Sequence, residues 1–206
     1  IESCRGSVVR WLAVTVQGDL YVSPPGVVTN RLEGRLPGTL VEVAEGLDGV
    51  EGVSTYLSSE LLVEGWGMTR FVALGLDPRG ERSLELMATG PGGRTGAFEA
   101  FRSGEGVLVS EPFAFRHALS PGDPVPLPTG AELPILGAFR DYGSEAGSVM
   151  VARTAWDALL ARAGGEPTDQ VTSLALFLDP GLRDDPARVA EVAGALRAAA
   201  GIPLQA

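Results

Sequence analysis

Two β-α-β patterns, separated by a long strand-rich stretch, constrain the fold of this chain more than any other feature of its sequence. The first begins with the strand-like "DLYVS" (19–23) and ends with the strand "GVSTYLSSELLVE" (52–64). The second begins with "SVMVA" (148–152) and ends with "SLALFLD" (173–179), and a helical apolar pattern lies inside each. Two such halves predict an α+β fold, with a split, ferredoxin-like layer of helices on a sheet.

The stretch between the two halves predicts an inserted β-rich lobe over residues 65–144. The first lobe is then discontinuous and consists of residues 1–64 and 145–206. Within the insert, prolines at alternate positions in "PVPLP" (124–128) predict an edge strand, because proline cannot donate to a strand ladder. The glycine-rich "GPGGRTG" (90–96) matches neither phosphate-binding fingerprint and predicts a plain loop.

Local signals predict where several helices begin. Thr39 with Glu42 three residues later has the spacing of a capping box. Asp185 before Pro186 predicts an N-cap followed by proline in the first turn. Near the N-terminus, apolar residues spaced from Val8 to Val16 fall on one face of a further helix, which Gly18 ends.

The charge balance excludes some partners. The net charge is −10, with 26 acidic residues against 16 basic ones, which argues against nucleic-acid binding and against docking on anionic lipid. Apolar runs are far shorter than the roughly 20 residues of a membrane-spanning helix. The chain opens at Ile1 in the middle of an apolar pattern, so we expect it to be a piece of a longer protein.

The sequence offers no recognisable catalytic, cofactor or metal site. His117 is the only histidine and lies in no nucleophile context, so we interpret it as structural or exposed. Cys4 is the only cysteine, which excludes an intrachain disulfide and the usual zinc ligand sets. A carboxylate-only Ca²⁺ or Mg²⁺ site and a hydrolase with paired carboxylates both stay open in principle.

One polar cluster lies where the insert ends. In "GAFRDYGSEAGS" (137–148), Arg140, Asp141, Tyr142 and Glu145 stand among glycines that allow the chain to turn. Such a cluster fits either a catalytic site or a junction between two lobes. We predict the junction, because adjacent residues on a strand point to opposite faces and each can pair with a neighbouring element.

Four segments, in this order, resemble the extracytoplasmic domain of FtsX-like ABC transporter permeases, the MacB-like periplasmic core. They are "SVVRWLAVTVQGDLYVS" (7–23), "LDGVEGVSTY" (47–56), "GEGVLVSEPFAFRHALSPGDPVPLPT" (104–129) and "PILGAFRDYGSEAGSVMVARTAW" (134–156). The resemblance continues in "LALFLDPG" (174–181) and covers most of the chain, although residues 65–100 match poorly.

The resemblance implies a porter-like βαβ lobe with an inserted β-rich lobe, on the extracytoplasmic face of a bacterial cell membrane (the periplasm in a diderm). It implies no enzyme and no cofactor in this chain, because ATP would be bound by a partner ATPase subunit reached through membrane segments outside the chain. The domain would couple transmembrane motion to export or extraction of a lipid, lipoprotein or peptide, or to an extracytoplasmic partner. The alternatives are a freestanding extracytoplasmic lipid- or peptide-binding module and the carboxylate-dependent hydrolase.

Overall fold

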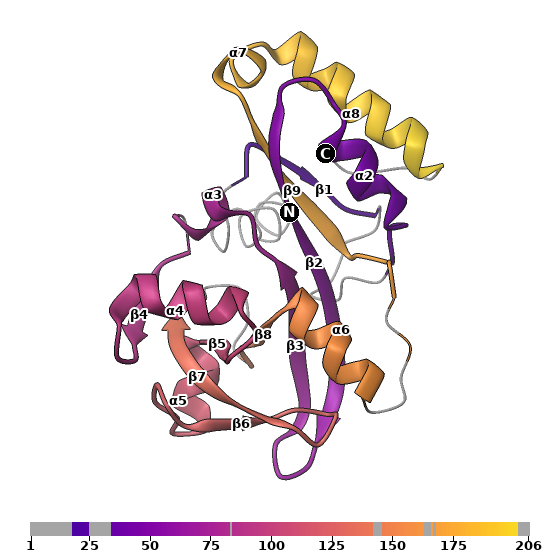
Figure 1. The fold of residues 1–206 in the computed structure, drawn as a ribbon. Helices are drawn as coiled ribbons and strands as arrows, with labels where there is room; N and C mark the ends of the chain where they lie inside the picture. The colour runs from indigo at the N-terminus through magenta and orange to yellow at the C-terminus, as the bar shows by residue number, and fades with distance from the viewer. Residues whose placement is uncertain are drawn as a thin grey trace, which may run out of the picture.

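A computed structural model describes residues 18–24, 34–82, 84–141, 146–162, 166 and 168–201. Within these residues, nine strands form one mixed sheet in the order β1-β9-β2-β3-β8-β5-β7-β4, with β6 paired to β7 (Figure 1). The strands are β1 (Leu20–Val22), β2 (Val50–Val63), β3 (Gly67–Gly75), β4 (Leu86–Thr89), β5 (Val107–Ser110), β6 (Pro124–Pro126), β7 (Glu132–Phe139), β8 (Val149–Ala152) and β9 (Ser173–Leu178). The predicted α+β class is confirmed.

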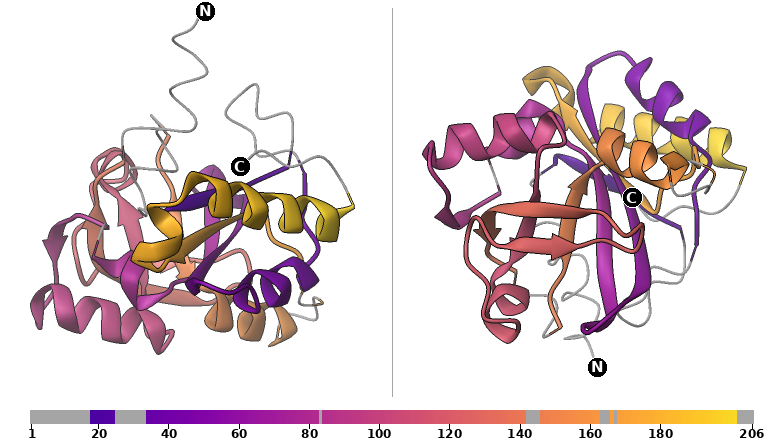
Figure 2. Two further views of the ribbon diagram at one scale, coloured as in Figure 1. Left: turned by 90° about the horizontal axis from the view of Figure 1, so that it is seen from above. Right: turned by 60° about the horizontal axis from the view of Figure 1, so that its bottom comes forward.

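Helices pack on both faces of the sheet. They are α2 (Thr39–Glu45), α3 (Pro78–Glu81), α4 (Gly93–Arg102), α5 (Glu111–Arg116), α6 (Arg153–Arg162), α7 (Pro180–Arg183) and α8 (Pro186–Ala200). α2 packs against α8 at one end of the molecule, and α5 lies at the other end (Figures 1 and 2). The helix predicted over residues 8–16 lies outside the described residues.

A long hairpin of β2 and β3 runs between the two ends of the sheet (Figure 1). β2 pairs with β9 from Val50 to Tyr56 and with β3 from Thr55 to Val63, and both pairings are antiparallel. The predicted lobe boundary between residues 64 and 65 falls in the turn of this hairpin, where Gly65 takes the left-handed φ of +79°. The hairpin was not predicted, because residues 52–64 and 70–77 were assigned to different lobes.

Side chains that alternate along the strands divide the core between the two faces of the sheet. On one face, Leu174 and Leu176 of β9 pack with α2 and α8, and further along Phe71 and Trp156 stack with ring centroids 5.6 Å apart. On the opposite face, Phe98 and other apolar side chains of α4 pack with the central strands and with β9. β8 and α6 pack with β3 and β5, although the sequence analysis assigned them to the first lobe. The division into lobes stays a prediction.

The start of α2 differs from what the sequence predicts, and the start of α8 agrees. The capping box of Thr39 does not form, because the N-cap is Gly38 and no side chain caps the helix. A Cβ at Gly38 would collide with the carbonyl oxygen of Asp169, so this close approach requires glycine. At α8 the prediction is confirmed, since the Asp185 carboxylate accepts from the backbone N–H of Ala187 at 3.0 Å and of Arg188 at 3.3 Å.

The predicted loop over residues 90–96 is partly wrong, because α4 begins at Gly93. Glycines disfavour a helix by about 1 kcal/mol each relative to alanine. Here burial outweighs that cost, since Phe98 and Phe101 of the same helix are almost fully buried. The guanidinium of Arg94 also lies 4.8 Å from the Phe98 ring centroid and donates to the Leu84 carbonyl at 2.7 Å. Tertiary contacts therefore continue the helix into the glycine-rich segment.

The proline-rich β6 is confirmed as an edge strand, because it pairs with β7 alone among the described strands. Its partner β7 then continues beyond the short β6 to pair with β4 and with β5. β7, which Arg140 directly follows, is therefore paired with a strand on each side.

Candidate functional site

The structure places the predicted junction residues at the end of β7. Arg140 donates its backbone N–H to the Glu85 carbonyl at 3.1 Å, and its guanidinium lies 3.3 Å from the Glu85 carboxylate. These contacts join the ends of β7 and β4, both within residues 65–144. Asp141 is buried, with 8% of its surface exposed. Tyr142 and Glu145 lie outside the described residues, and the junction role of the four residues stays a prediction.

A buried hydroxyl that the sequence analysis missed lies beside this cluster. Ser110 Oγ accepts from the backbone N–H of Ser148 at 2.8 Å and from that of Phe113 at 3.4 Å. It therefore caps α5 and also holds the segment that leads into β8. Gly147 has a φ of +74°, and a Cβ there would lie 2.5 Å from Ser110 Oγ, so the segment approaches Ser110 closely. "VSEP" in the sequence carries the signal, since serine precedes Glu-Pro at a helix start.

His117 belongs to an aromatic cluster at the hairpin turn. Its ring stacks on Trp66 with centroids 4.8 Å apart, and it lies 4.6 Å from the Phe113 ring. Burial lowers the pKa of His117 below its ordinary value of 6.5, and the positive charge of Arg116 lowers it further. The cluster fastens the turn of the β2–β3 hairpin to α5.

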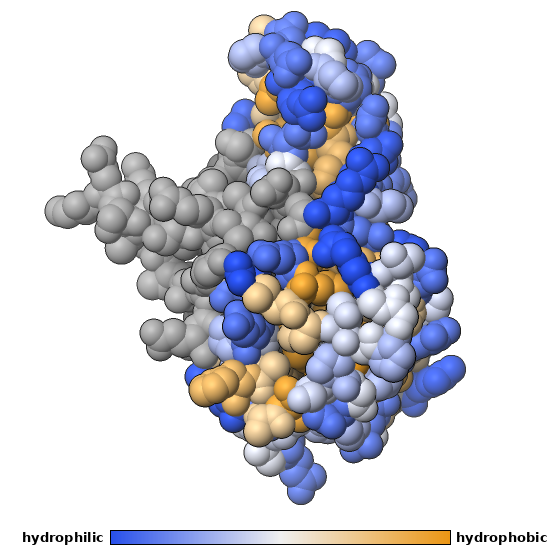
Figure 3. All heavy atoms as spheres, turned by 90° about the vertical axis from the view of Figure 1, so that its left-hand side faces the viewer, coloured by the Kyte–Doolittle hydropathy of each residue, from blue (hydrophilic) through white to orange (hydrophobic). Residues whose placement is uncertain are grey.

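Exposed apolar side chains surround this cluster. Phe115 on α5 has 87% of its surface exposed, and Leu62 and Met68 form a largely exposed cross-strand pair near the hairpin turn. Hydrophobic residues also gather in the lower half of the face drawn in Figure 3. The surface around the hairpin turn and α5 is therefore more apolar than is usual for a surface in contact with water alone.

A second residue that the sequence analysis missed is Arg153, at the start of α6. Its Nε donates to both carboxylate oxygens of Asp157 at 2.9 and 3.1 Å, and its guanidinium donates to the carbonyls of Gln170 and Thr168. Only 15% of its side chain is exposed. Arg153 therefore ties α6 to the segment that enters β9, which contacts the α2–α8 end.

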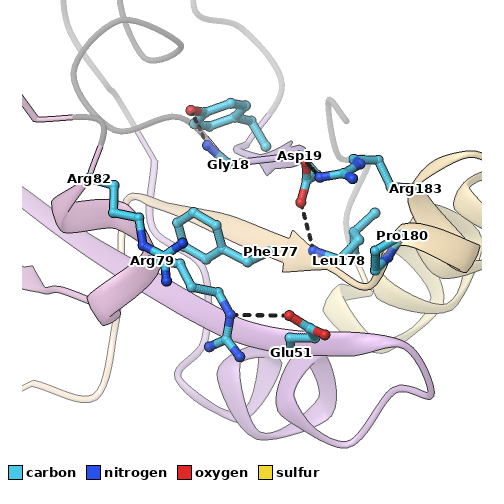
Figure 4. Close-up of a pocket in the computed structure, with 10 residues that line it drawn as sticks. Gly18, Asp19, Glu51, Arg79, Arg82, Phe177, Leu178, Pro180 and Arg183 are labelled. Carbon is cyan, nitrogen blue, oxygen red and sulfur yellow. Dashed lines mark hydrogen bonds and ion pairs between the residues drawn. The ribbon is translucent and has the colours of Figure 1, made fainter.

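A polar cleft of about 870 Å³ lies between α3 and α7, and we call it the arginine cleft (Figure 4). Phe177, Leu178 and Pro180 form its less polar part. Its charged residues are Asp19, Glu51, Arg79, Arg82 and Arg183. None of these was singled out from the sequence, because they come from four separate segments that only the folded sheet brings together.

Hydrogen bonds and ion pairs position the walls of the arginine cleft. Asp19 accepts from the Leu178 backbone N–H at 2.8 Å, which fixes β1 to the end of β9. Tyr21 Oη accepts from the Gly18 N–H at 2.7 Å, and burial raises the pKa of this phenol. Arg79 is 3.2 Å from Glu51. These contacts hold the polar side chains of the cleft in place against the sheet, so the cleft can hold a charged ligand.

Within the described residues, no group of three or more His, Cys, Asp or Glu side chains is arranged to hold a metal ion. The described helices also include none that is both long and apolar enough to cross a bilayer.

Comparison with known proteins identifies relatives of the chain. No family model matches it. Over 198 residues it is 29% identical to the uncharacterized ABC transporter permease protein Rv0987 of Mycobacterium tuberculosis, a match that covers 88% of this chain and 21% of that protein. The chain therefore spans about a fifth of the length of this relative.

Two solved structures share the fold. The periplasmic region of MacB from Actinobacillus actinomycetemcomitans superposes with a TM-score of 0.60 at 13% identity, covering 100% of this chain and 92% of that one. The extracellular domain of the noncanonic ABC-type transporter YknZ from Gram-positive bacteria superposes with a TM-score of 0.54 at 15% identity, covering 90% and 97%. The resemblance predicted from the sequence is confirmed, since this chain has the fold of such domains and is similar in sequence to an ABC transporter permease.

Proposed function

We propose that this chain is the extracytoplasmic domain of an ABC transporter permease and that it couples ATP-driven motion of membrane helices to work outside the membrane. The single observation that carries the proposal is the sequence similarity to a permease over 88% of the chain. The shared fold with periplasmic and extracellular transporter domains supports it independently. In this proposal the chain itself performs no chemistry, and a partner ATPase subunit binds and hydrolyses ATP.

The continuous sheet suits such a coupling role. β2 contributes to the core under α2 and α8 and, further along, to the core that holds α6 and the aromatic cluster. A force applied at one end is therefore transmitted through backbone hydrogen bonds and not through a flexible linker. The expected motion is a rigid-body displacement with small changes at the joints between packed elements.

The work performed outside the membrane would be export or extraction of a lipid, lipoprotein or peptide, or the control of an extracytoplasmic partner protein. A freestanding binding module is the second candidate function, and the arginine cleft favours it. The two differ in whether the chain needs an ATPase and membrane segments to act.

Cysteine labelling in the parent protein tests the proposed location. In a parent protein in which Cys4 and every cysteine outside this chain are replaced by serine, Glu166→Cys places one thiol at an exposed position. We expect a membrane-impermeant maleimide to label it in intact cells, with an outer membrane, if present, first made permeable. The same parent without Glu166→Cys is the matched control. Labelling only after the cytoplasmic membrane is broken would contradict an extracytoplasmic position.

Transport coupling needs a separate measurement. The parent permease and its ATPase, reconstituted in vesicles, should lose most of their extracytoplasmic work when the α2–α8 end and the hairpin end are deleted together, while basal ATP hydrolysis persists. Equal activity with and without the domain would contradict the proposed coupling.

A further inference from the structure

The arginine cleft combines positive charge and open volume in an acidic protein. Its three arginines come from opposite walls, with Arg79 and Arg82 on the α3 side and Arg183 on α7 (Figure 4). Two carboxylates, those of Asp19 and Glu51, share the lining, so the cleft carries a net charge of +1 (three arginines minus two acids) while the whole chain carries −10. The lining of the cleft is therefore more basic than the chain as a whole, and Asp77 and Asp184 outside the lining also pair with its arginines.

The three arginines are engaged to different extents. Arg79 is held by Glu51 at 3.2 Å and by Asp77 at 3.4 Å. Arg183 makes only long contacts, 3.7 Å to Asp19 and 3.9 Å to Asp184. Within the described part of the chain, the guanidinium of Arg82 makes no hydrogen bond or ion pair. The cleft thus contains donors that internal carboxylates leave largely available.

The ends of α3 and α7 do not account for this charge. Asp77 already caps α3 by accepting from the Arg79 backbone N–H at 2.8 Å, and Asp179 caps α7 by accepting from that of Leu182 at 2.8 Å. The available donors in the cleft are guanidinium groups, which bind oxyanions through two parallel N–H bonds.

The carboxylates in the lining select the kind of anion. A ligand with one carboxylate gains little, because Asp19 and Glu51 already supply that group to Arg183 and Arg79 and repel a further single charge. A phosphate ester has up to three acceptor oxygens and, as a monoester, carries a charge of about −1.5 to −2. Its higher charge and its additional acceptor oxygens can therefore outweigh the repulsion when it binds the guanidinium of Arg82.

We propose that the arginine cleft binds a phosphate-bearing organic ligand, with the phosphate on the guanidinium of Arg82 and the organic part against Phe177. The volume of about 870 Å³ lies within the range of small-molecule sites. The phosphate can belong to a soluble metabolite-sized molecule or to a lipid headgroup, and the chemistry of recognition is the same for both.

NMR titration of the 206-residue chain tests the proposal, with inorganic phosphate and glycerol phosphate as probes. We expect saturable shifts of the backbone amides of Gly18, Asp19 and Leu178, which line the cleft. Arg82→Gln should weaken the binding of glycerol phosphate by about fivefold, since the lost bonds are charge-assisted but partly screened by solvent. Arg162→Gln is the matched control, because Arg162 is an exposed arginine of α6 outside the cleft and should leave binding unchanged.

A vesicle arm distinguishes the two sources of phosphate. If phosphatidic acid vesicles, whose headgroup is a phosphate monoester, bind the chain with the same dependence on Arg82, while phosphatidylcholine vesicles do not, the ligand is a lipid headgroup. If glycerol phosphate binds and neither vesicle does, the ligand is soluble. Either result supports a phosphate site.

Three results would overturn the proposal. They are no shift at the cleft amides at high phosphate, an equal loss of binding in Arg162→Gln, and an aspartate-rich peptide that competes as well as glycerol phosphate. Because the titration needs neither membrane nor ATPase, its failure leaves the proposed transport function untouched, and a failure of transport leaves the titration interpretable.

Discussion

At the scale of single residues, Ser110 shows how one buried hydroxyl joins two segments that are distant in sequence. Its Oγ serves the first turn of α5 and the backbone of Ser148. A buried N–H left without a partner costs about 1–3 kcal/mol, and a lost N-cap costs about 1 kcal/mol. The residue thus stabilises the segment that leads into β8 as well as its own helix.

Replacing Ser110 should therefore be costly. We expect Ser110→Ala to lower the free energy of unfolding by about 2 kcal/mol, measured by urea denaturation. Ser103→Ala is the control, since Ser103 is exposed at the end of α4, and its change should stay within about 0.5 kcal/mol. Equal effects of the two variants would contradict the role given to Ser110.

His117 makes a second prediction possible, because it is the only histidine and gives a single set of imidazole NMR signals. Its pKa is lowered in the folded chain by burial and by Arg116, so the unfolded chain binds the proton more tightly. The stability that follows is fully present above about pH 6.5 and decreases as the pH falls through the lower, folded-state pKa.

Titration by NMR should give a pKa for His117 below 6.5. Wild-type chain should also lose more stability between pH 7.5 and pH 5 than the His117→Gln variant loses, since glutamine does not titrate in this range. A pKa at or above the ordinary value would show that the contacts with Trp66 and Phe113 do not bury the ring as described.

At the scale of secondary-structure elements, the sequence predicted those features that depend on local chemistry. The proline-rich edge strand β6 and the cap of α8 by Asp185 both follow from single-residue preferences. The start of α4 was missed because burial of Phe98 and Phe101 outweighs the preference of its glycines, and the cap of α2 was missed because Asp169 approaches Gly38. Such effects come from contacts between distant segments, which local patterns do not contain.

The same reason explains why the arginine cleft was not predicted. Arg183 is separated from Arg79 and Arg82 by about a hundred residues of sequence, and no spacing rule joins them. Arg140 and Asp141 were singled out instead, since they are adjacent and flanked by glycine.

Arg153 allows a test at this scale, because it links α6 to the segment before β9. Removing it leaves Asp157 and two backbone carbonyls without their charged donor. We expect Arg153→Ala to lower the free energy of unfolding by about 2 kcal/mol, and Arg153→Lys to restore only part of it, because lysine lacks the planar fork of donors.

The matched control is Arg162→Ala, which removes an exposed arginine from the last turn of the same helix. Its effect on the free energy of unfolding should stay within about 0.5 kcal/mol. If Arg162→Ala and Arg153→Ala were equally destabilising, the loss would not come from the link to β9.

At the scale of the whole molecule, Asp141 tests whether the end of β7 is a junction between lobes. A carboxylate that is 92% buried needs hydrogen-bond donors around it, and its removal disturbs them (100% minus the 8% exposed). We expect Asp141→Ala to reduce stability by about 1–3 kcal/mol and to reduce transport in the full permease. Unchanged stability together with unchanged transport would contradict the junction.

β2 can act as a lever arm, because it connects the α2–α8 end of the molecule to the hairpin turn. Tyr56 pairs with Ser173 of β9 and with Leu74 of β3, so the strand passes from one partner to the other at that point. From Leu57 to Val63 the lever arm measures about 20 Å at ~3.3 Å per residue. A tilt of about five degrees at the α2–α8 end would swing the hairpin turn by ~2 Å. A motion too small to repack the core under α2 and α8 would thereby become a displacement of the hairpin turn that is large enough to open or close a contact there.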